Sequence, residues 1–293
     1  MKELLNKAHT LVEALPYIKD FHGKTIVVKY GGSIGSEELS NFARDLILMK
    51  YVGIKPVVVH GGGPQIAEHL EKQGLKSSFI AGLRVTDTKT MEIAEMVLVG
   101  KVNQQIINSI NQHGGKAVGL SGKEGQIIRA KKINLKKLAK ENGIKIPRNA
   151  DLGMVGEVEK INPELIRTLE NSGYIPVIAP IGVDGDGNTF NINADHVASK
   201  IAGSLDAAKL VLLTNVPGIL DDRKKLISSI TESTVKKLIK KETISQGMIP
   251  KVMCALEALH EGVDKVHIID GTVERAVILE IFTDSGIGTE IMI

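Results

Sequence analysis

The sequence predicts an α/β fold, a three-layer αβα arrangement around an open, mainly parallel sheet. Short apolar runs alternate with longer segments whose apolar residues recur at helical spacing, the pattern of strands joined by crossover helices. The 293 residues are 43% hydrophobic but include only five Phe, four Tyr and no Trp, so the core must consist of Ile, Leu and Val. Such a core is typical of parallel strands covered by helices on both faces.

The elements can be assigned in order from these patterns. The apolar runs predict strands at 25–30, 56–60, 117–120, 175–179, 209–213, 265–269 and 289–293. The periodic segments predict helices at 37–52, 64–73, 88–112, 163–171, 194–203, 233–240, 250–261 and 274–281. Asn162 before Pro163 marks one helix start, and Thr231 or Ser233 marks another.

A further amphipathic helix is predicted within residues 2–20, ahead of the first strand. Its apolar stripe consists of Leu4, Leu5, Ala8, Leu11, Val12 and Leu15. Pro16 disfavours a helical conformation at Leu15, so the helix is expected to end or kink there. A helix with such a stripe needs a partner surface, which is either its own domain or another subunit.

Two segments depart from the alternation of strands and helices. Residues 121–160 are rich in Lys and Gly and predict hairpins on one side of the sheet. Residues 184–188, Asp-Gly-Asp-Gly-Asn, have the most turn-like composition in the chain, and we expect a lobe boundary directly before them. The chain then divides into residues 1–20, 21–183 and 184–293.

Composition and charge exclude several classes of protein. The formal net charge is only +3, and the lysines near position 131 are interpreted as a solvated face, so no nucleic-acid partner is expected. No apolar run has the length of a membrane span, and no signal-peptide region is evident. The single cysteine, Cys254, is interpreted as a core residue in a reducing compartment. We therefore expect a cytoplasmic protein with no membrane partner.

Two glycine-rich turns carry the first functional signal. Lys29-Tyr30-Gly31-Gly32 ends the first predicted strand, and His60-Gly61-Gly62-Gly63-Pro64 ends the second. Glycine lets a ligand approach the backbone closely, and amides at the start of the following helix point toward an anion. With Lys29 just inside its strand, the two turns predict a cradle for a phosphate or a carboxylate.

Other motifs do not fit. Gly23-Lys24-Thr25 lacks the upstream glycine of a Walker A loop and precedes a strand. Residues 184–195 approach calcium-loop spacing but have Thr189 in place of the glycine and Asp195 in place of the final Glu. No histidine pair has zinc-site spacing, and no G-x-S-x-G elbow is present. Phosphate chemistry outside the P-loop class remains, and no protein-held metal is expected.

Four more segments suit that chemistry. Arg84 can grip a carboxylate through its planar fork, although a surface arginine in a loop is a slightly more common explanation. Asn193 and Asp195 enter a helix, where such residues belong in any case. Residues 212–219 follow a buried strand and can wrap a base or ribose. Lys251 begins a helix, where its charge opposes the helix dipole, and an anionic ligand would explain that placement.

In their order along the chain, these segments resemble the amino acid kinase family. Lys29-x-Gly31-Gly32 and Asn191-x-Asn193-Ala194-Asp195 are general to that family. Gly82-Leu83-Arg84-Val85-Thr86, beside the His-Gly-Gly-Gly-Pro turn, is particular to the branch that phosphorylates N-acetylglutamate. Residues 215–220 and 247–251 complete the order, so the resemblance covers nearly the whole chain.

The resemblance implies a carbamate kinase-like fold with an extra N-terminal helix, and it implies roles for individual residues. Residues 1–20 would serve oligomerisation, 21–183 acetylglutamate binding and dimerisation, and 184–293 ATP binding and an arginine site. Lys29 and Lys251 would flank the transferring phosphoryl group, with Asp195 orienting both. The implied acetylglutamate contacts are Gly62, Gly63, Arg84 and Asn191. The implied ATP contacts are Gly31 and Gly32 at the phosphates and Thr214, Asn215, Val216 and Gly218 at the base and ribose.

The implied reaction is the ATP-dependent phosphorylation of the γ-carboxylate of N-acetyl-L-glutamate to N-acetyl-L-glutamyl 5-phosphate, a step of arginine biosynthesis. A glutamate side chain has a reference pKa of about 4.3, so this carboxylate is ionised at neutral pH and needs no general base. The difficulty is its approach to a polyanionic phosphate. Lysines, backbone amides and Mg²⁺ held mainly by ATP and water would reduce that repulsion.

Two alternatives stay open. An N-acetyl-aminoadipate kinase, or another carboxylate or carbamate kinase of this fold, would share most motifs, and a pocket discriminates one methylene by only ~1–3 kcal/mol. A catalytically idle regulator that binds arginine would also keep the fold. Such a regulator has no need for both Lys29 and Lys251.

The resemblance extends to an arginine-inhibited branch in which an N-terminal helix interlaces dimers into a hexamer. Leu15-Pro16-Tyr17-Ile18 and residues 279–289 match that branch. The implied arginine contacts are Tyr17, Lys209, Glu280, Gly286 and Gly288. Arg275 stands where this branch usually has histidine, and an added cation there would weaken binding of a cationic effector. We expect a homo-hexamer that L-arginine inhibits.

Overall fold

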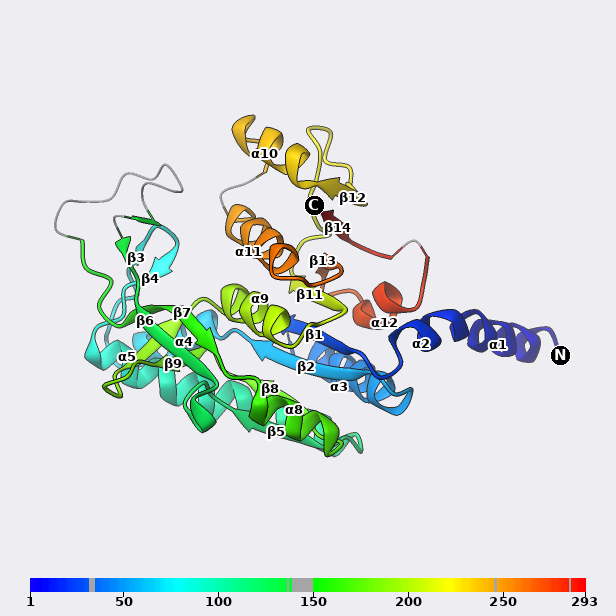
Figure 1. Cartoon of the computed structure of the whole chain (residues 1–293), viewed down its shortest axis with the longest axis horizontal. Helices are drawn as coiled ribbons and strands as arrows, with labels where there is room; N and C mark the ends of the chain where they lie inside the picture. The colour runs from blue at the N-terminus through cyan, green and yellow to red at the C-terminus, as the bar shows by residue number, and fades with distance from the viewer. Residues whose placement is uncertain (32–34, 136, 139–149, 245–246, 285) are drawn as a thin grey trace.

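An eight-stranded sheet forms the centre of the molecule (Figure 1). The computed structural model describes residues 1–31, 35–135, 137–138, 150–244, 247–284 and 286–293. The strand order is β12 (Ser229–Thr231), β14 (Thr289–Met292), β13 (Val266–Asp270), β11 (Lys209–Thr214), β1 (Thr25–Tyr30), β2 (Lys55–His60), β8 (Ile175–Ile178) and β5 (Ala117–Leu120). The strands predicted from apolar runs are therefore confirmed to within a residue or two.

The sheet is parallel from β13 to β5, and only β14 runs antiparallel to its neighbour β13. In the centre of the sheet, Lys29 of β1 lies between Leu212 of β11 and Val59 of β2. Parallel strands end at one edge, so the chain segments after β1, β2, β11 and β13 all emerge together. This edge is where ligands bind in open α/β sheets.

Helices cover both faces of the sheet, as predicted. They are α3 (Ser36–Tyr51), α4 (Gly63–Lys72), α5 (Thr88–Glu95), α6 (Gln104–Gln112), α8 (Glu164–Asn171), α9 (Ala194–Ser204), α10 (Glu232–Lys240), α11 (Ile249–His260) and α12 (Ala276–Ile281). Alternate strand residues enter two cores: Val27 packs with α8 to α11, whereas Val28 packs with α3 to α6 and α12. This alternation is the physical basis of the three layers. None of the helices that the structure describes is long and apolar enough to span a bilayer.

The prediction of one regular α-helix over 88–112 is wrong. A π-helical stretch, η1 (Met96–Asn103), separates α5 from α6. Asn103 at its end is buried, and its side-chain amide donates to the carbonyl of Val177 at 2.9 Å and lies 3.1 Å from Nε2 of His60. The π-helical stretch thus coincides with the place where the polar side chain of Asn103 reaches from the helical layer to β2 and β8.

The N-terminal segment consists of α1 (Lys2–Glu13) and α2 (Leu15–Phe21), with Pro16 in the first turn of α2. The predicted break at Leu15 and Pro16 is confirmed, one residue earlier than expected, at Ala14. Proline is tolerated in a first helical turn, where its missing N–H has no partner to lose. Figure 1 shows α1 extending away from the rest of the molecule.

A small closed barrel lies beside the sheet. Its strands are β10 (Thr189–Ile192), β7 (Val155–Ile161), β6 (Ile128–Lys132) and β9 (Ile181–Val183). The antiparallel pair β6 and β7 confirms the hairpin predicted in 121–160, although residues 136 and 139–149 lie outside the described part. The boundary predicted before Asp184 falls in the turn between β9 and β10, which pair with each other. The division into lobes stays a prediction.

Candidate active site

A pocket of about 220 Å³ opens where the carboxyl ends of β1 and β2 meet the barrel. Strand β2 leads directly into Gly61 and then into α4, and the β10 strand of the barrel leads into α9. A short hairpin, β3 (Phe79–Ile80) and β4 (Leu83–Arg84), forms another wall. The polar residues in its lining include Lys29, Arg84, Asn191, Asn193 and Asp195.

Three charged side chains from separate elements meet at one side of this pocket. Nζ of Lys29, near the end of β1, lies 2.9 Å from Oδ1 of Asp195, in the first turn of α9. Nζ of Lys251, in the first turn of α11, donates to Oδ2 of the same carboxylate at 2.8 Å. The structure thus brings together all three residues that the resemblance gave to catalysis, which are 222 positions apart at the extremes, from Lys29 to Lys251.

Burial and the contacts within the trio act together on the pKa values of Asp195 and Lys29. Burial alone would raise the pKa of Asp195, but the ammonium groups of Lys29 and Lys251 outweigh it and lower that pKa to about 2. Burial lowers the pKa of Lys29, Asp195 opposes this effect, and Lys251 adds to it. Asp195 is therefore a fixed carboxylate rather than a proton acceptor, and two lysines on one carboxylate leave an excess of positive charge.

Asp195 is held in place by the helix start that the sequence predicted. The side chain of Asn193 accepts hydrogen bonds from the backbone N–H groups of Asp195 at 2.8 Å and His196 at 3.3 Å. The cap fixes the first turn of α9. Its position in turn sets where the Asp195 carboxylate lies between β1 and α11.

Arg84 supplies a second positive group at the pocket wall. Its Nη2 donates to the carbonyl of Gly63 at 2.8 Å, its Nη1 donates to the hydroxyl of Ser77, and its guanidinium lies 4.8 Å from the centre of the Phe79 ring. The side chain is 9% exposed, and no described carboxylate pairs with it. A guanidinium positioned in this way can receive a ligand carboxylate.

The other residues implied in acceptor binding surround Arg84. Gly62 and Gly63 form the start of α4 and line the pocket, and no side chain caps this helix start. A Cβ at Gly62 would lie 2.5 Å from Cδ2 of Leu98. Nδ2 of Asn191 donates to Oγ1 of Thr86 at 3.3 Å. The pocket therefore combines amides, an amide side chain and a guanidinium.

The strand residue before these glycines is a neutral histidine. His60 is completely buried, and burial lowers its pKa to about 4. Its Nδ1 lies 2.9 Å from the carbonyl of Gly61, and its Nε2 lies 3.1 Å from Nδ2 of Asn103. His60 therefore organises the turn and does not act as a base. Sequence reasoning assigned no role to Asn103, Ser77 or Phe79, because their partners come from other elements.

The residues implied in base and ribose binding lie at the same sheet edge, outside this pocket. Thr214 ends β11, and its carbonyl accepts from the backbone N–H of Gly271 after β13 at 2.8 Å. Gly218 has a φ of +143°, and a Cβ there would lie 2.7 Å from Oγ1 of Thr289. Gly31 follows β1 between the two regions, whereas Gly32 lies outside the described residues.

The residues implied in arginine binding gather near the start of β11, at the opposite edge of the sheet. Nζ of Lys209 lies 3.4 Å from Oε1 of Glu280, which also contacts Nδ1 of His267. Oε2 of Glu280 accepts from the backbone N–H of Ile287 at 3.0 Å. Gly286 has a φ of +56°, and a Cβ there would lie 2.7 Å from that oxygen.

Two further groups border this cluster. Tyr17 of α2 donates to Asp284, and Lys209 lies 5.6 Å from the centre of the Phe21 ring, so α2 adjoins the cluster. A Cβ at Gly288 would lie 2.2 Å from the carbonyl of Ile268. Arg275 instead pairs with Asp45 of α3 at 3.2 Å.

Outside the pocket, three side chains that could hold a metal ion lie close together within the described part of the chain. His196, Cys254 and Glu257 form that group of three. A thiol in the set suits a softer cation than Mg²⁺, which prefers oxygen ligands. Any Mg²⁺ in the pocket would depend on oxygens from a bound nucleotide and water.

Comparisons with known proteins agree with this geometry. A protein of Syntrophobacter fumaroxidans named acetylglutamate kinase is 54% identical over 291 residues, which is 99% of this chain and 97% of the relative. N-acetylglutamate synthase from Neisseria gonorrhoeae, solved with coenzyme A and N-acetyl-glutamate, has a TM-score of 0.85 and 26% identity. The match covers 98% of this chain and 63% of the synthase chain. Carbamate kinase from Giardia lamblia, with a TM-score of 0.64 and 18% identity over 92% of this chain and 98% of its own, shares the fold.

The match to a family profile covers most of the chain. The amino acid kinase family profile matches residues 24–270, a range that includes Lys29, Arg84, Asp195 and Lys251. The kinase-like fold and the high identity to a full-length relative agree with that match. This chain belongs to the amino acid kinase family.

Proposed function

We propose that this enzyme is an acetylglutamate kinase, which transfers the γ-phosphoryl group of ATP to the γ-carboxylate of N-acetyl-L-glutamate in arginine biosynthesis. The observation that carries the proposal is the contact of Lys29 and Lys251 with one carboxylate of Asp195, beside a pocket that holds a guanidinium with no described carboxylate partner. The name of the 54% identical relative supports the choice of acceptor.

The charges of the site account for the chemistry. A γ-carboxylate oxygen of acetylglutamate attacks the γ-phosphorus, the bond from that phosphorus to the bridging oxygen breaks, and ADP leaves with the electron pair. Lys29 and Lys251 would stabilise the negative charge on the transferring group, because the Asp195 carboxylate holds both ammonium groups close together at the pocket. Asp195 keeps them apart and oriented, and its low pKa excludes a role as base.

Binding of the acceptor would use the opposite wall of the pocket. Arg84 would pair with the α-carboxylate of acetylglutamate, and the amides at Gly62 and Gly63 and the side chain of Asn191 would receive its remaining polar groups. ATP would lie on Gly31 and Gly32 and on residues 214–218. Bound Mg²⁺, held by ATP oxygens and water, would supply further neutralisation of phosphate charge.

We also propose that the enzyme works in the cytoplasm as an arginine-inhibited hexamer. A single unpaired cysteine supports a reducing compartment. The cluster of Lys209, Glu280 and Tyr17 next to α2 supports an effector site that adjoins the N-terminal helices. The Neisseria synthase, 26% identical to this chain, has also been solved with L-arginine, at a TM-score of 0.83.

The experiment that tests the activity measures acyl phosphate formation, trapped with hydroxylamine, with N-acetyl-L-glutamate and with N-acetyl-aminoadipate. We expect faster turnover of acetylglutamate. Faster turnover of the longer acceptor would make this chain an aminoadipate kinase. Failure to form any ATP-dependent acyl phosphate, in a preparation that binds arginine, would favour an idle regulator.

A further inference from the structure

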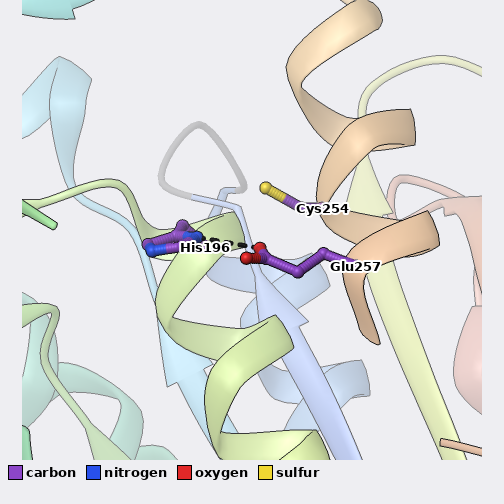
Figure 2. Close-up of side chains that lie close together, drawn as sticks. All are labelled: His196, Cys254 and Glu257. Atoms are coloured by element: carbon purple, nitrogen blue, oxygen red, sulfur yellow. Dashed lines mark hydrogen bonds and ion pairs between the residues drawn. The ribbon is translucent and has the colours of Figure 1, made fainter. Parts of the chain in front are cut away.

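A cluster of three metal-ligating side chains lies between α9 and α11, outside the residues used for phosphoryl transfer. Figure 2 shows His196 of α9 facing Cys254 and Glu257 of α11. One ring nitrogen, the thiol sulfur and one carboxylate oxygen all lie within 4.8 Å of one another, and all three residues are partly buried. The lining of the substrate pocket includes none of the three, although His196 directly follows Asp195 and shares its cap at Asn193.

Local helix geometry brings the donors together. Cys254 and Glu257 are three residues apart on α11, so their side chains share one face of that helix. His196 lies in the first turn of α9, and its Nδ1 lies 3.0 Å from Oε2 of Glu257. Helices α9 and α11 contribute buried apolar residues such as Ala198 and Ala255 to one core, which fixes the spacing of the two helices along their line of contact, the seam.

We propose that His196, Cys254 and Glu257 bind one Zn²⁺ or a similar thiophilic divalent cation, with water in the fourth position. Zinc is the common divalent ion whose preferred donors include imidazole nitrogen, thiolate sulfur and carboxylate oxygen together. Three protein ligands and one water is a frequent zinc arrangement. Mg²⁺ bound with the nucleotide does not compete, because it prefers oxygen donors.

The spacing of the donors permits this coordination. Usual zinc bond lengths in a tetrahedral site put the donors roughly 3.3–3.8 Å apart. His196 Nδ1 and Glu257 Oε2, at 3.0 Å, already lie this close, and the donors that are farthest apart, within 4.8 Å, must approach by about 1 Å, which rotation of the Cys254 side chain can provide. Burial raises the pKa of the Cys254 thiol, so the thiol binds as a thiolate only when the cation displaces its proton.

The charged groups around the seam decide the affinity. Nζ of Lys200 lies 2.7 Å from Oε1 of Glu257 and also pairs with Glu261. The oxygen that faces His196 is the other one, Oε2, so a cation can take that oxygen while Lys200 keeps its contacts. Lys251 is engaged by Asp195. Lys200 is therefore the cation that most directly opposes metal binding.

The test uses the full-length protein, freed of metal with a chelator and titrated with Co²⁺ and then with Zn²⁺ against a chelating dye. We expect wild type to bind one Co²⁺ with the near-ultraviolet absorption of a thiolate–cobalt bond. Cys254→Ser should lose that absorption and bind Zn²⁺ roughly tenfold or more weakly. His196→Asn and Glu257→Gln should also weaken binding, and Lys200→Met should strengthen it.

His260→Asn is the matched control, since His260 is an exposed histidine at the other end of α11 that pairs with Glu232. It should leave both the absorption and the affinity unchanged. Circular dichroism establishes that each variant is folded. A folded wild type without the thiolate–cobalt absorption, or equal Zn²⁺ affinity in wild type and Cys254→Ser, would overturn the proposal. So would a Lys200→Met variant that binds Zn²⁺ more weakly than wild type.

Discussion

The carboxylate of Asp195 connects the two lysines on which the proposed chemistry depends. It is the nearest negative charge to both ammonium groups, and it opposes the effect of burial on the pKa of Lys29. An isolated buried ammonium would tend to lose its proton. Asp195 therefore keeps Lys29 charged as well as positioned, which explains why an acidic residue lies in a site for two anionic substrates.

Replacing either lysine should affect the chemical step more than binding. Lys29→Ala and Lys251→Ala should each lower kcat by roughly 10²-fold or more, because their charge is needed most as phosphoryl charge develops. Steady-state kinetics with both substrates varied would measure this, with Lys24→Ala, an exposed lysine, as control. A change confined to KM for ATP would contradict the assigned role.

Asp195→Asn should produce a related effect with a distinct pH signature. Without the carboxylate, burial and Lys251 both lower the pKa of Lys29 unopposed. The alkaline limb of the kcat–pH profile should then move to lower pH, in addition to a drop in kcat. An unchanged limb would mean that Asp195 acts only by holding α9 against α11.

Arg84 should separate acceptor binding from catalysis. Its guanidinium has no described carboxylate partner and lines the same pocket as Lys29. Arg84→Ala should raise KM for acetylglutamate by roughly tenfold or more with a smaller effect on kcat, and Arg84→Lys should recover only part of the loss because it lacks the planar fork. If KM for ATP rose instead, the acceptor and nucleotide regions would be exchanged.

At the scale of elements, the parallel strands and most helices could be predicted because their signals are local. The π-helical stretch at 96–103 could not, since Asn103 is placed by contacts to Val177 and His60 that are distant in sequence. The barrel strands β9 and β10 were missed for a similar reason: β9 has only three residues, and one of its two partners, β6, lies about fifty residues earlier in the chain. Likewise, no spacing rule could join His196 to Cys254 across two helices.

The contact between α3 and α12 gives a prediction about stability and pH. Asp45 of α3 is buried beside Arg275, and burial, partly opposed by Arg275, raises its pKa to about 6 from an ordinary value of 3.8. Between those values the folded state holds a proton that the unfolded state has lost, so this group lowers stability as pH rises through the window. A shift of about two pKa units corresponds to roughly 3 kcal/mol.

Asp45→Asn removes this titration. At a fixed protein concentration, the free energy of unfolding of the variant, relative to that of wild type, should increase by up to roughly 3 kcal/mol between pH 4 and about 6. Above that pH the difference should stay constant. Arg275→Gln removes the group that lowers the pKa of Asp45, and should move the upper end of the window above pH 6. Parallel pH dependence in wild type and Asp45→Asn would show that the carboxyl has the same pKa in both states.

At the scale of the whole molecule, the sheet connects two groups of residues that lie at its opposite edges. Strand β11 begins at Lys209, beside Glu280, and ends at Thr214, next to the proposed nucleotide region. Strand β1 next to it carries Lys29. The sequence motifs predicted which residues belong to each group. The contacts within the group near Lys209 could not be predicted, because they depend on how α2 and α12 pack.

The N-terminal helix should determine assembly and the response to arginine. Five large apolar residues of its stripe are each more than half exposed in the isolated chain: Leu4, Leu5, Leu11, Val12 and Leu15. An exposed stripe of this size is typical of a surface that another subunit covers. Arginine can inhibit only if it binds one arrangement of the subunits better than another, so assembly and inhibition should be lost together.

Deleting residues 1–20 should therefore give an active dimer that millimolar arginine does not inhibit, as measured by light scattering after gel filtration and by assay. A full-length variant with Leu4→Ser and Leu11→Ser should behave in the same way without removing Tyr17, which separates loss of assembly from loss of an effector contact. A truncated protein that stays hexameric would refute the role of the helix in assembly. A full-length protein that arginine does not inhibit would refute the effector site. In that case Arg275, whose positive charge lies beside α3, would be the first residue to replace, with histidine.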